Sequence, residues 1–354
     1  MKLAVLGAGA IGPASAVLAI SRGHQAVLWS PSGAGIAGLT GAITAEGLIA
    51  GDFPLVATIS LEEAFRGADA ALLAVPAYAF DSVLPRIAEA LPPHLPLLIA
   101  PAASLAPLVL DALLARRGAD PRRAPIGAMA TTPGGARRLG PARVKVAMLR
   151  SAVEMAAVPA AAAPAMAALA SDLFGLDCPL SPDALHVALL NLNPIAHAVL
   201  ALTNVTRMER GEDWPQYAMM TPAACRMMEA MGAERDALAA AFGHRLESLA
   251  TFLQRANRLP LAPLAEIAAA IAERRPDVLG PKTMESRYVT EDVPFGLAFY
   301  QAIAATAGVK MPVTDAVVTA LEALWGRDLR RNTLLDAIDM TDLPALLRDG
   351  VGRN

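Results

Sequence analysis

The chain has 354 residues, a length that suits two domains better than a single core. Its formal net charge of −3 gives no basic surplus of the kind that nucleic-acid-binding domains carry, so we expect no nucleic-acid partner. Two cysteines are too few for a disulfide framework or a cysteine-based metal cluster, and they are typical of a reducing cytosol. We therefore expect a cytoplasmic protein of two domains without a bound metal.

The first elements of the chain form one repeating unit. An apolar run over residues 2–6 predicts a strand, and Gly-Ala-Gly-Ala-Ile-Gly follows at residues 7–12. An alanine-rich helix over residues 13–21 and a second apolar strand over residues 25–29 complete a βαβ unit. In this context the first glycine permits the tight turn, the second lets the backbone approach a pyrophosphate, and the third lets the helix pack closely. The turn is therefore predicted to bind a dinucleotide.

The end of the second strand bears on the form of that dinucleotide. NAD-preferring sites usually carry an acidic residue here that binds the ribose hydroxyls, whereas this chain has Ser30. A neutral residue removes the repulsion against a 2′-phosphate, to which Ser30 and Ser32 could donate. The loop that follows contains no Arg or Lys, so the local sequence offers no positive partner. The pattern favours NADP and leaves NAD open. The candidate cofactor-binding residues are Gly7, Gly9, Ala10, Ile11, Gly12, Ser30, Ser32, Val75 and Pro76.

Later apolar runs extend the same pattern. Strands are predicted over residues 70–75, 97–100, 144–149 and 154–158, with a helix over residues 163–174. Near-continuous apolar strands are typical of a parallel sheet that is covered on both faces. The sequence therefore predicts an α/β Rossmann domain with a doubly wound parallel sheet over residues 1–180.

The pattern changes after Ser181-Pro182, which is a typical helix start. From there most segments predict helices, namely residues 183–203, 220–241, 261–272, 291–307 and 313–325. Residues 181–354 are therefore predicted to form an all-helical domain.

High mean hydropathy, at +0.43, raises the question of a membrane span. The two most apolar windows, residues 97–115 and 152–170, are each interrupted by two prolines. A transmembrane helix needs about 20 consecutive apolar residues, and glycines near the N-terminus also disrupt a signal-peptide layout. We attribute the hydropathy to alanine richness and expect no membrane association.

Two polar segments of the helical domain are candidates for chemistry. In the first, Asn193 and His197 are four residues apart and share one helix face, with Pro194 expected to bend the helix. A lone histidine on an apolar helix is usually a satisfied core residue, and that interpretation stays open.

In the second segment, Arg287 is a candidate clamp for a carboxylate, and Asp292 could bond the far nitrogen of a histidine. The alternative is an ordinary helix start, with Thr290 or Asp292 as its cap. Spacing alone does not decide between these interpretations.

These segments carry a resemblance to the opine dehydrogenase family, which includes the octopine and nopaline dehydrogenases. The chain resembles this family over nearly its whole length, chiefly at Asn193-Pro194-x-x-His197 and at Arg287-Tyr288-x-Thr290-Glu291-Asp292-Val293-Pro294-Phe295-Gly296. The resemblance implies that His197 and Asp292 form the catalytic pair. It also implies that Asn193 orients His197 or the substrate and that Arg287 anchors a substrate carboxylate. Ser30 departs from the pattern of NAD-using relatives.

The reaction that the resemblance implies is a reductive condensation. The amine of an amino acid and a 2-oxo acid such as pyruvate form an imine, which NAD(P)H reduces. Two alternatives stay open: a single-substrate reductase for 2-hydroxy acids or ketopantoate, and a non-catalytic dinucleotide-sensing protein. Ketopantoate-type enzymes rely on a catalytic lysine, and no lysine lies between Lys145 and Lys282. The apolar helical domain is compatible with a homodimer.

Overall fold

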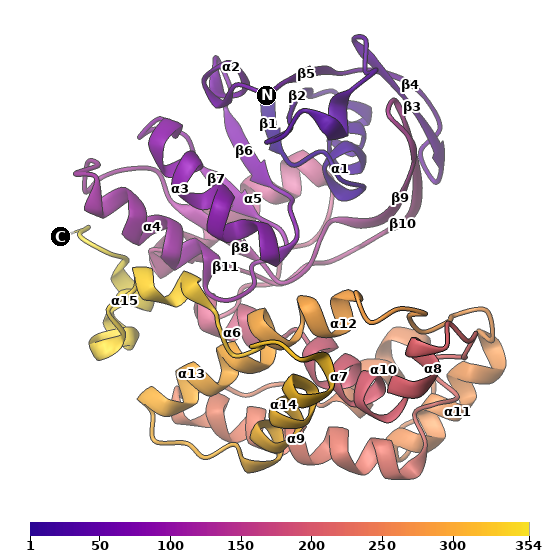
Figure 1. Cartoon of the computed structure of the whole chain (residues 1–354). Helices are drawn as coiled ribbons and strands as arrows, with labels where there is room; N and C mark the ends of the chain where they lie inside the picture. The colour runs from indigo at the N-terminus through magenta and orange to yellow at the C-terminus, as the bar shows by residue number, and fades with distance from the viewer. Residues whose placement is uncertain (354) are drawn as a thin grey trace. The chain divides into compact units, whose positions relative to one another are not determined.

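The computed structural model of the protein describes residues 1–353, which form two compact units (Figure 1). The first unit contains residues 1–188 together with the C-terminal segment that begins at Thr333. The second unit is Leu189–Asn332. The sequence predicts a single boundary between residues 180 and 181. The observed division differs from it at both ends of the helical part.

A buried carboxylate explains why the end of the chain returns to the first unit. Asp111 is 0% exposed and accepts hydrogen bonds from the guanidinium groups of Arg123 and Arg353. Its second oxygen accepts from the backbone N–H of Val351 at 2.7 Å. These bonds tie the C-terminal residues to α4 (Ala106–Arg116), the helix that carries Asp111. A buried carboxylate needs such partners, and local sequence gives no sign of one so far along the chain.

Seven strands form the central sheet of the first unit. In spatial order they are β11 (Met155–Val158), β8 (Ile126–Met129), β7 (Leu97–Ile99), β6 (Ala70–Leu73), β1 (Lys2–Leu6), β2 (Gln25–Trp29) and β5 (Val56–Thr58). Neighbours are parallel except β11, which runs antiparallel to β8. The expected Rossmann domain with a mostly parallel sheet is confirmed.

Helices cover both faces of this sheet. α1 (Ile11–Ser21) packs with α5 (Ala163–Phe174), and α3 (Phe80–Ala90) packs with α4. The step from β1 to β2 and the step from β6 to β7 run in opposite directions along the sheet. Right-handed crossovers therefore place α1 and α3 on opposite faces (Figure 1).

A second sheet was not predicted. Its four strands lie in the order β4 (Gly51–Pro54), β3 (Ala42–Gly47), β10 (Arg143–Leu149) and β9 (Gly134–Gly140). The expected strand over residues 144–149 belongs here, and its buried Val144 and Val146 alternate with exposed residues. Such alternation is typical of a strand with one buried face.

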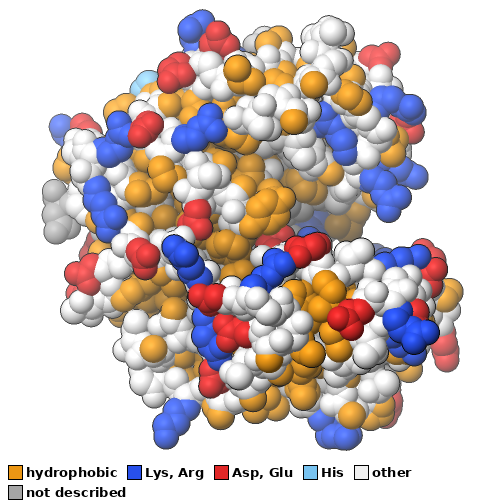
Figure 2. Space-filling model, viewed as in Figure 1, with side chains coloured by type: hydrophobic (Ala, Val, Ile, Leu, Met, Phe, Trp, Pro, Cys, Tyr) orange, Lys and Arg blue, Asp and Glu red, His pale blue; other side chains and the backbone are white. Residues whose placement is uncertain are grey.

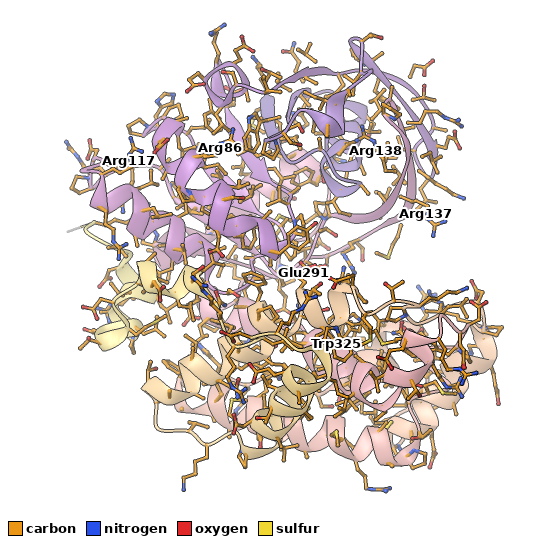
Figure 3. All side chains as sticks on the ribbon, viewed as in Figure 1. Arg86, Arg117, Arg137, Arg138, Glu291 and Trp325 are labelled. Carbon is orange, nitrogen blue, oxygen red and sulfur yellow. The ribbon has the colours of Figure 1, made fainter. Side chains whose placement is uncertain are left out.

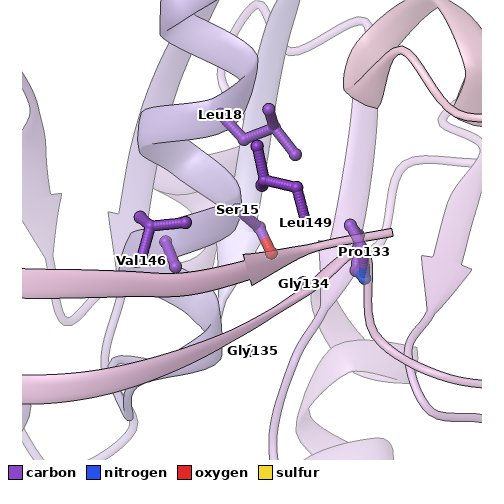
Figure 4. A pocket seen from close by; sticks show the side chains of 8 residues that line it. Ser15, Leu18, Pro133, Gly134, Gly135, Val146 and Leu149 are labelled. Carbon is purple, nitrogen blue, oxygen red and sulfur yellow. The ribbon is translucent and has the colours of Figure 1, made fainter. Parts of the chain in front are cut away.

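The second sheet packs against α1 on the side away from the main sheet. Figure 4 shows Ser15 and Leu18 of α1 beside Val146 and Leu149 of β10, around a cavity of only about 10 Å³. A helix that is enclosed in this way is apolar all round, and α1 is buried continuously from Gly12 to Ala19.

The second unit is built from helices, as expected. They are α7 (Asn193–Thr203), α8 (Val205–Glu209), α9 (Pro222–Ala241), α10 (Leu249–Asn257), α11 (Leu264–Arg274), α12 (Arg287–Thr290), α13 (Ala298–Thr306) and α14 (Pro312–Trp325). A π-helical turn, η4 (Val293–Leu297), leads into α13. The long helix expected over residues 291–307 therefore begins with a different backbone.

The helix expected over residues 183–203 is two helices, α6 (Ala184–Leu189) and α7. The side chain of Asn191 accepts a hydrogen bond from the backbone N–H of Asn193 at 3.1 Å, and Pro194 stands in the first turn of α7. Pro194 therefore starts a helix rather than bending one, which corrects the sequence interpretation. By length and composition Ala184–Thr203 passes a test for a membrane span, yet 67% of its most apolar window is buried inside the protein. That is the burial of a core helix.

Charged side chains of both signs are interspersed on the face drawn in Figure 2, in keeping with the small net charge of −3.

Candidate active site

The glycine turn combines two glycines that packing requires with one that packing does not. Gly7 has a φ of +128°, and a Cβ there would lie 2.5 Å from the carbonyl oxygen of Ala74. A Cβ on Gly12 would lie 1.7 Å from the carbonyl oxygen of Gly7. A Cβ on Gly9, in contrast, would meet no atom within 4 Å. The protein leaves open space at Gly9, and this space fits the close approach of a ligand.

The other predicted cofactor-binding residues differ in exposure. Ala10 and Ile11 are half-buried at the N-terminus of α1, where backbone N–H groups are available to an anion. Ser30 is only 2% exposed, whereas Ser32 is exposed. Of the two serines, Ser32 is thus the better placed for a direct contact. Val75 is buried, and Pro76 is exposed.

An arginine from the second sheet holds the glycine turn against the loop after β2. Arg138 of β9 donates to the carbonyl oxygens of Ala8 at 3.1 Å and Gly35 at 2.6 Å (Figure 3). It also donates to Gly9 O at 3.3 Å, and burial lowers the pKa of its guanidinium from the usual value. Sequence reasoning missed this residue because β9 lies far along the chain.

A second arginine, also missed, stands beside the end of β2. The guanidinium carbon of Arg86, on α3, lies 5.2 Å from the centre of the Trp29 ring. Its Nη1 donates to the carbonyl oxygen of Pro31 at 3.4 Å (Figure 3). Arg86 therefore supplies a positive charge near Ser30 and Ser32, where the local sequence has none.

In the second unit, the two polar segments meet. Nδ1 of His197, on α7, lies 2.8 Å from Oδ2 of Asp292, the residue before η4. The two residues are 8% and 5% exposed. A Cβ on Gly296 would lie 2.3 Å from Cγ of Pro194, so only glycine lets η4 pack so closely on the start of α7. The glycine and proline of the two segments thus hold the histidine and aspartate together.

Arg287 and Asn193 lie beside this pair in different ways. Nε of Arg287 is 3.8 Å from Oδ2 of Asp292, and 58% of the arginine side chain is exposed. Its guanidinium keeps most of its donors for another partner. Asn193 is exposed one turn before His197, and its side chain makes no hydrogen bond within residues 1–353.

Tyr288 is a further member of the site that sequence reasoning did not assign. Its ring stacks on the imidazole of His197 with 3.6 Å between the centroids and 5° between the planes. Its hydroxyl donates to Oε1 of Gln216. Burial raises the pKa of Tyr288, with smaller raising effects from Tyr217 and Asp292 and an opposing one from Arg287. The only sign in the sequence was its place next to Arg287.

This geometry is suited to proton transfer. An ionised carboxylate only accepts hydrogen bonds, so Nδ1–H of His197 is the donor to Oδ2 of Asp292. Nε2 of His197 makes no hydrogen bond within the part of the chain that the structure describes. It is therefore left to give or take a proton, while Asp292 stabilises the imidazolium that forms.

Each of the two units contains a segment that matches a known protein family model. Residues 180–325 match the family model described as NAD/NADP octopine/nopaline dehydrogenase, alpha-helical domain, and residues 2–101 match NAD-dependent glycerol-3-phosphate dehydrogenase N-terminus. An opine dehydrogenase from Arthrobacter sp. (strain 1C) is 28% identical over 351 residues, 97% of this chain and 96% of its own.

Solved structures share the fold of this chain. A structure of octopine dehydrogenase with NADH and L-arginine has a TM-score of 0.79 at 18% identity, covering 98% of each chain. Yersinopine dehydrogenase with NADP⁺ bound has a TM-score of 0.70 at 16% identity, covering 98% of this chain and 97% of its own. The resemblance to the opine dehydrogenases that the sequence predicts is confirmed, with residues 180–325 matching the octopine/nopaline dehydrogenase model.

Proposed function

We propose that this protein is an NAD(P)-dependent opine dehydrogenase, which joins the amine of an amino acid to a 2-oxo acid and reduces the resulting imine. The observation that carries the proposal is the buried pair of His197 and Asp292, 2.8 Å apart, in a helical domain of the octopine/nopaline dehydrogenase type. The match to the opine dehydrogenase from Arthrobacter extends over almost the whole length of both chains.

The residues of the first unit fit a dinucleotide. The open space at Gly9 and the N-terminus of α1 would receive the pyrophosphate. When bound, NAD(P)H supplies the hydride that reduces the imine. We propose NADP as the preferred form, because Ser30 carries no charge to repel a 2′-phosphate and Arg86 stands beside it. Relatives with bound NADH and with bound NADP⁺ leave both forms open for the family.

His197 would transfer protons during the condensation. The amine nitrogen adds to the carbonyl carbon of the 2-oxo acid, and the carbonyl oxygen leaves as water. Two protons must leave the amine nitrogen and two must reach the departing oxygen to give the imine and water, and one proton must return to the nitrogen when hydride adds to the imine carbon. Nε2 of His197 can take and return a proton, while Asp292 holds Nδ1–H and stabilises the charged ring.

Arg287 and Asn193 would position the substrates. Arg287 is the better candidate for a substrate carboxylate, because its exposed guanidinium can form two parallel hydrogen bonds with the two oxygens. Asn193 would orient the substrate or His197 from the first turn of α7. Holding two substrates in one geometry accounts for much of the rate gain in such reactions.

The experiment is to follow the oxidation of NADPH and of NADH with pyruvate alone, with amino acids alone, and with both. We expect turnover only when both substrates are present. Turnover with a 2-oxo acid alone would indicate a hydroxy-acid dehydrogenase or ketopantoate-type reductase. Tight cofactor binding without turnover across a broad panel would indicate a dinucleotide-sensing protein.

We also propose a cytoplasmic location and a homodimeric state. Cys178 and Cys225 are free, and burial raises the pKa of each thiol to about 11. Light scattering after size-exclusion chromatography tests the dimer against a monomer of 36.6 kDa. Subcellular fractionation tests the location.

A further inference from the structure

One guanidinium group joins three segments of the first unit at the glycine turn. Nη1 of Arg138 donates to the carbonyl oxygens of Ala8 at 3.1 Å and Gly9 at 3.3 Å. Nη2 and Nε donate to backbone carbonyls of the loop after β2 and of the turn between β9 and β10, namely those of Gly35, Gly140 and Pro141. These carbonyl acceptors match in number the N–H donors of the arginine fork.

The acceptors of this guanidinium are all neutral. No carboxylate pairs with Arg138 within residues 1–353, and burial is what lowers the pKa of the side chain. A partly buried cation with only neutral partners is unfavourable unless an anion lies nearby. The charge of Arg138 therefore favours an anion at the glycine turn.

The bonds to Ala8 and Gly9 also fix the direction of two peptide units. In a planar trans peptide the C=O and the N–H point in opposite directions. The N–H groups of these two units belong to Gly9 and Ala10, so both point away from Arg138. Neither N–H donates a hydrogen bond within residues 1–353, and Gly9 is exposed. Two free backbone donors on one side of a turn are an arrangement that binds an anionic oxygen.

The same side chain fixes the loop after β2. A Cβ on Gly35 would lie 2.7 Å from Cβ of Ala8, so this loop packs directly on the glycine turn. Nη2 of Arg138 donates to the carbonyl oxygen of Gly35 at 2.6 Å. One residue thus fixes the turn that carries the free N–H groups relative to the loop that carries Ser32.

We propose that Arg138 is a positioning residue that directs the N–H groups of Gly9 and Ala10 to the diphosphate of the dinucleotide. It acts through the backbone of the turn and need not touch the cofactor. The inference rests on the proposed binding of NAD(P)H at the turn. It adds a residue from the second sheet, 130 positions further along the chain than Ala8.

The test is calorimetric titration of the full chain with ADP, which carries a diphosphate, and with adenosine, which carries none. We expect Arg138→Met to weaken ADP binding by about tenfold to a hundredfold and adenosine binding by less than about twofold. The reason is that only the diphosphate uses the two N–H groups. Equal weakening of both ligands would mean that Arg138 only supports the fold of the loop, and would overturn the proposal.

Arg137→Met is the matched control. Arg137 is the neighbour of Arg138 on β9, is exposed, and points to the other face of the strand (Figure 3). Its loss removes the same charge without touching the glycine turn, so this variant should bind ADP as the parent does. ADP binding weakened as much as in Arg138→Met would show a general effect of charge and would contradict the proposal.

Arg138→Lys separates charge from geometry. Lysine keeps the charge, but its donors radiate from one nitrogen, which cannot reach the turn, the loop and the hairpin together. We expect its affinity for ADP to lie between that of the parent and that of Arg138→Met. Affinity equal to that of the parent would mean that charge alone matters, and the positioning role would be refuted.

A second readout needs no variant and holds even if Arg138→Met fails to fold. In NMR spectra of the labelled parent, ADP should shift the amide signals of Gly9 and Ala10. The signal of Gly7 should shift less, because its N–H already donates to the carbonyl oxygen of Trp29 at 3.0 Å. Bound ADP with unmoved Gly9 and Ala10 signals would refute the inference.

Neither measurement involves turnover, so failure of the proposed condensation would not affect the result. Absence of ADP binding by the parent would overturn the nucleotide site and the inference with it.

Discussion

The exchange of Asp292 for asparagine is the sharpest perturbation of the candidate site, because it removes one charge and keeps the shape. Asp292 is 5% exposed and contacts His197 at 2.8 Å. Two opposite charges about 4 Å apart at an effective dielectric constant of about 20 attract by about 4 kcal/mol. Losing that attraction for the imidazolium in the transition state corresponds to a fall in kcat of about 10³-fold. Asparagine can also favour the wrong tautomer of His197.

The assay is steady-state NADPH oxidation with both substrates at saturation, together with cofactor titration by fluorescence. We expect kcat to fall by about 10³-fold while the Kd for the cofactor and the Tm change little. Asp213→Asn is the matched control, because Asp213 is an exposed carboxylate that pairs with Lys282 in the same unit. If kcat of the Asp292→Asn enzyme stayed within a few-fold of the parent, Asp292 would not stabilise charge on His197.

Three further predictions follow from single contacts. Arg86→Ala should weaken 2′,5′-ADP binding by about tenfold to a hundredfold and leave 5′-AMP binding unchanged in calorimetry; equal weakening of both nucleotides would contradict a 2′-phosphate contact. Tyr288→Ala should lower kcat about three- to tenfold more than Tyr288→Phe, which keeps the ring on His197; equal rates would mean that stacking does not position the imidazole. Asp111→Ala should lower the free energy of unfolding in urea by about 3–5 kcal/mol, because Arg123 and Arg353 lose their buried partner; a change below about 1 kcal/mol would contradict this.

The sequence indicates the parallel sheet because its central strands are buried on both faces and are therefore apolar without interruption. β3 escapes detection because only Ile43 and Ala45 of its six residues are buried. β4 escapes because it has four residues, Gly-Asp-Phe-Pro, none of which is buried. The break between α6 and α7 depends on a local hydrogen bond from Asn193 to the side chain of Asn191. An apolar pattern carries no information about such a bond.

The candidate site likewise contains residues that the sequence indicates and residues that only the structure reveals. His197 and Asp292 are 95 residues apart, so spacing cannot pair them, and family resemblance brought them together. Arg138 of β9 bonds the glycine turn, and Arg86 of α3 lies beside the end of β2. No local motif marks a residue whose role depends on such tertiary contacts. Tyr288 could have been suspected from its position beside Arg287, yet stacking on a histidine leaves no pattern in the sequence.

The most direct measurement of the proposed reaction is the mass of the product formed from an amino acid, pyruvate and NADPH that carries deuterium at the transferable position. Reductive condensation predicts a secondary amine whose mass is the sum of the two substrates less one oxygen atom, with one deuterium on carbon. Deuterated lactate as the product, with the amino acid recovered unchanged, would contradict the assignment of this protein as an opine dehydrogenase.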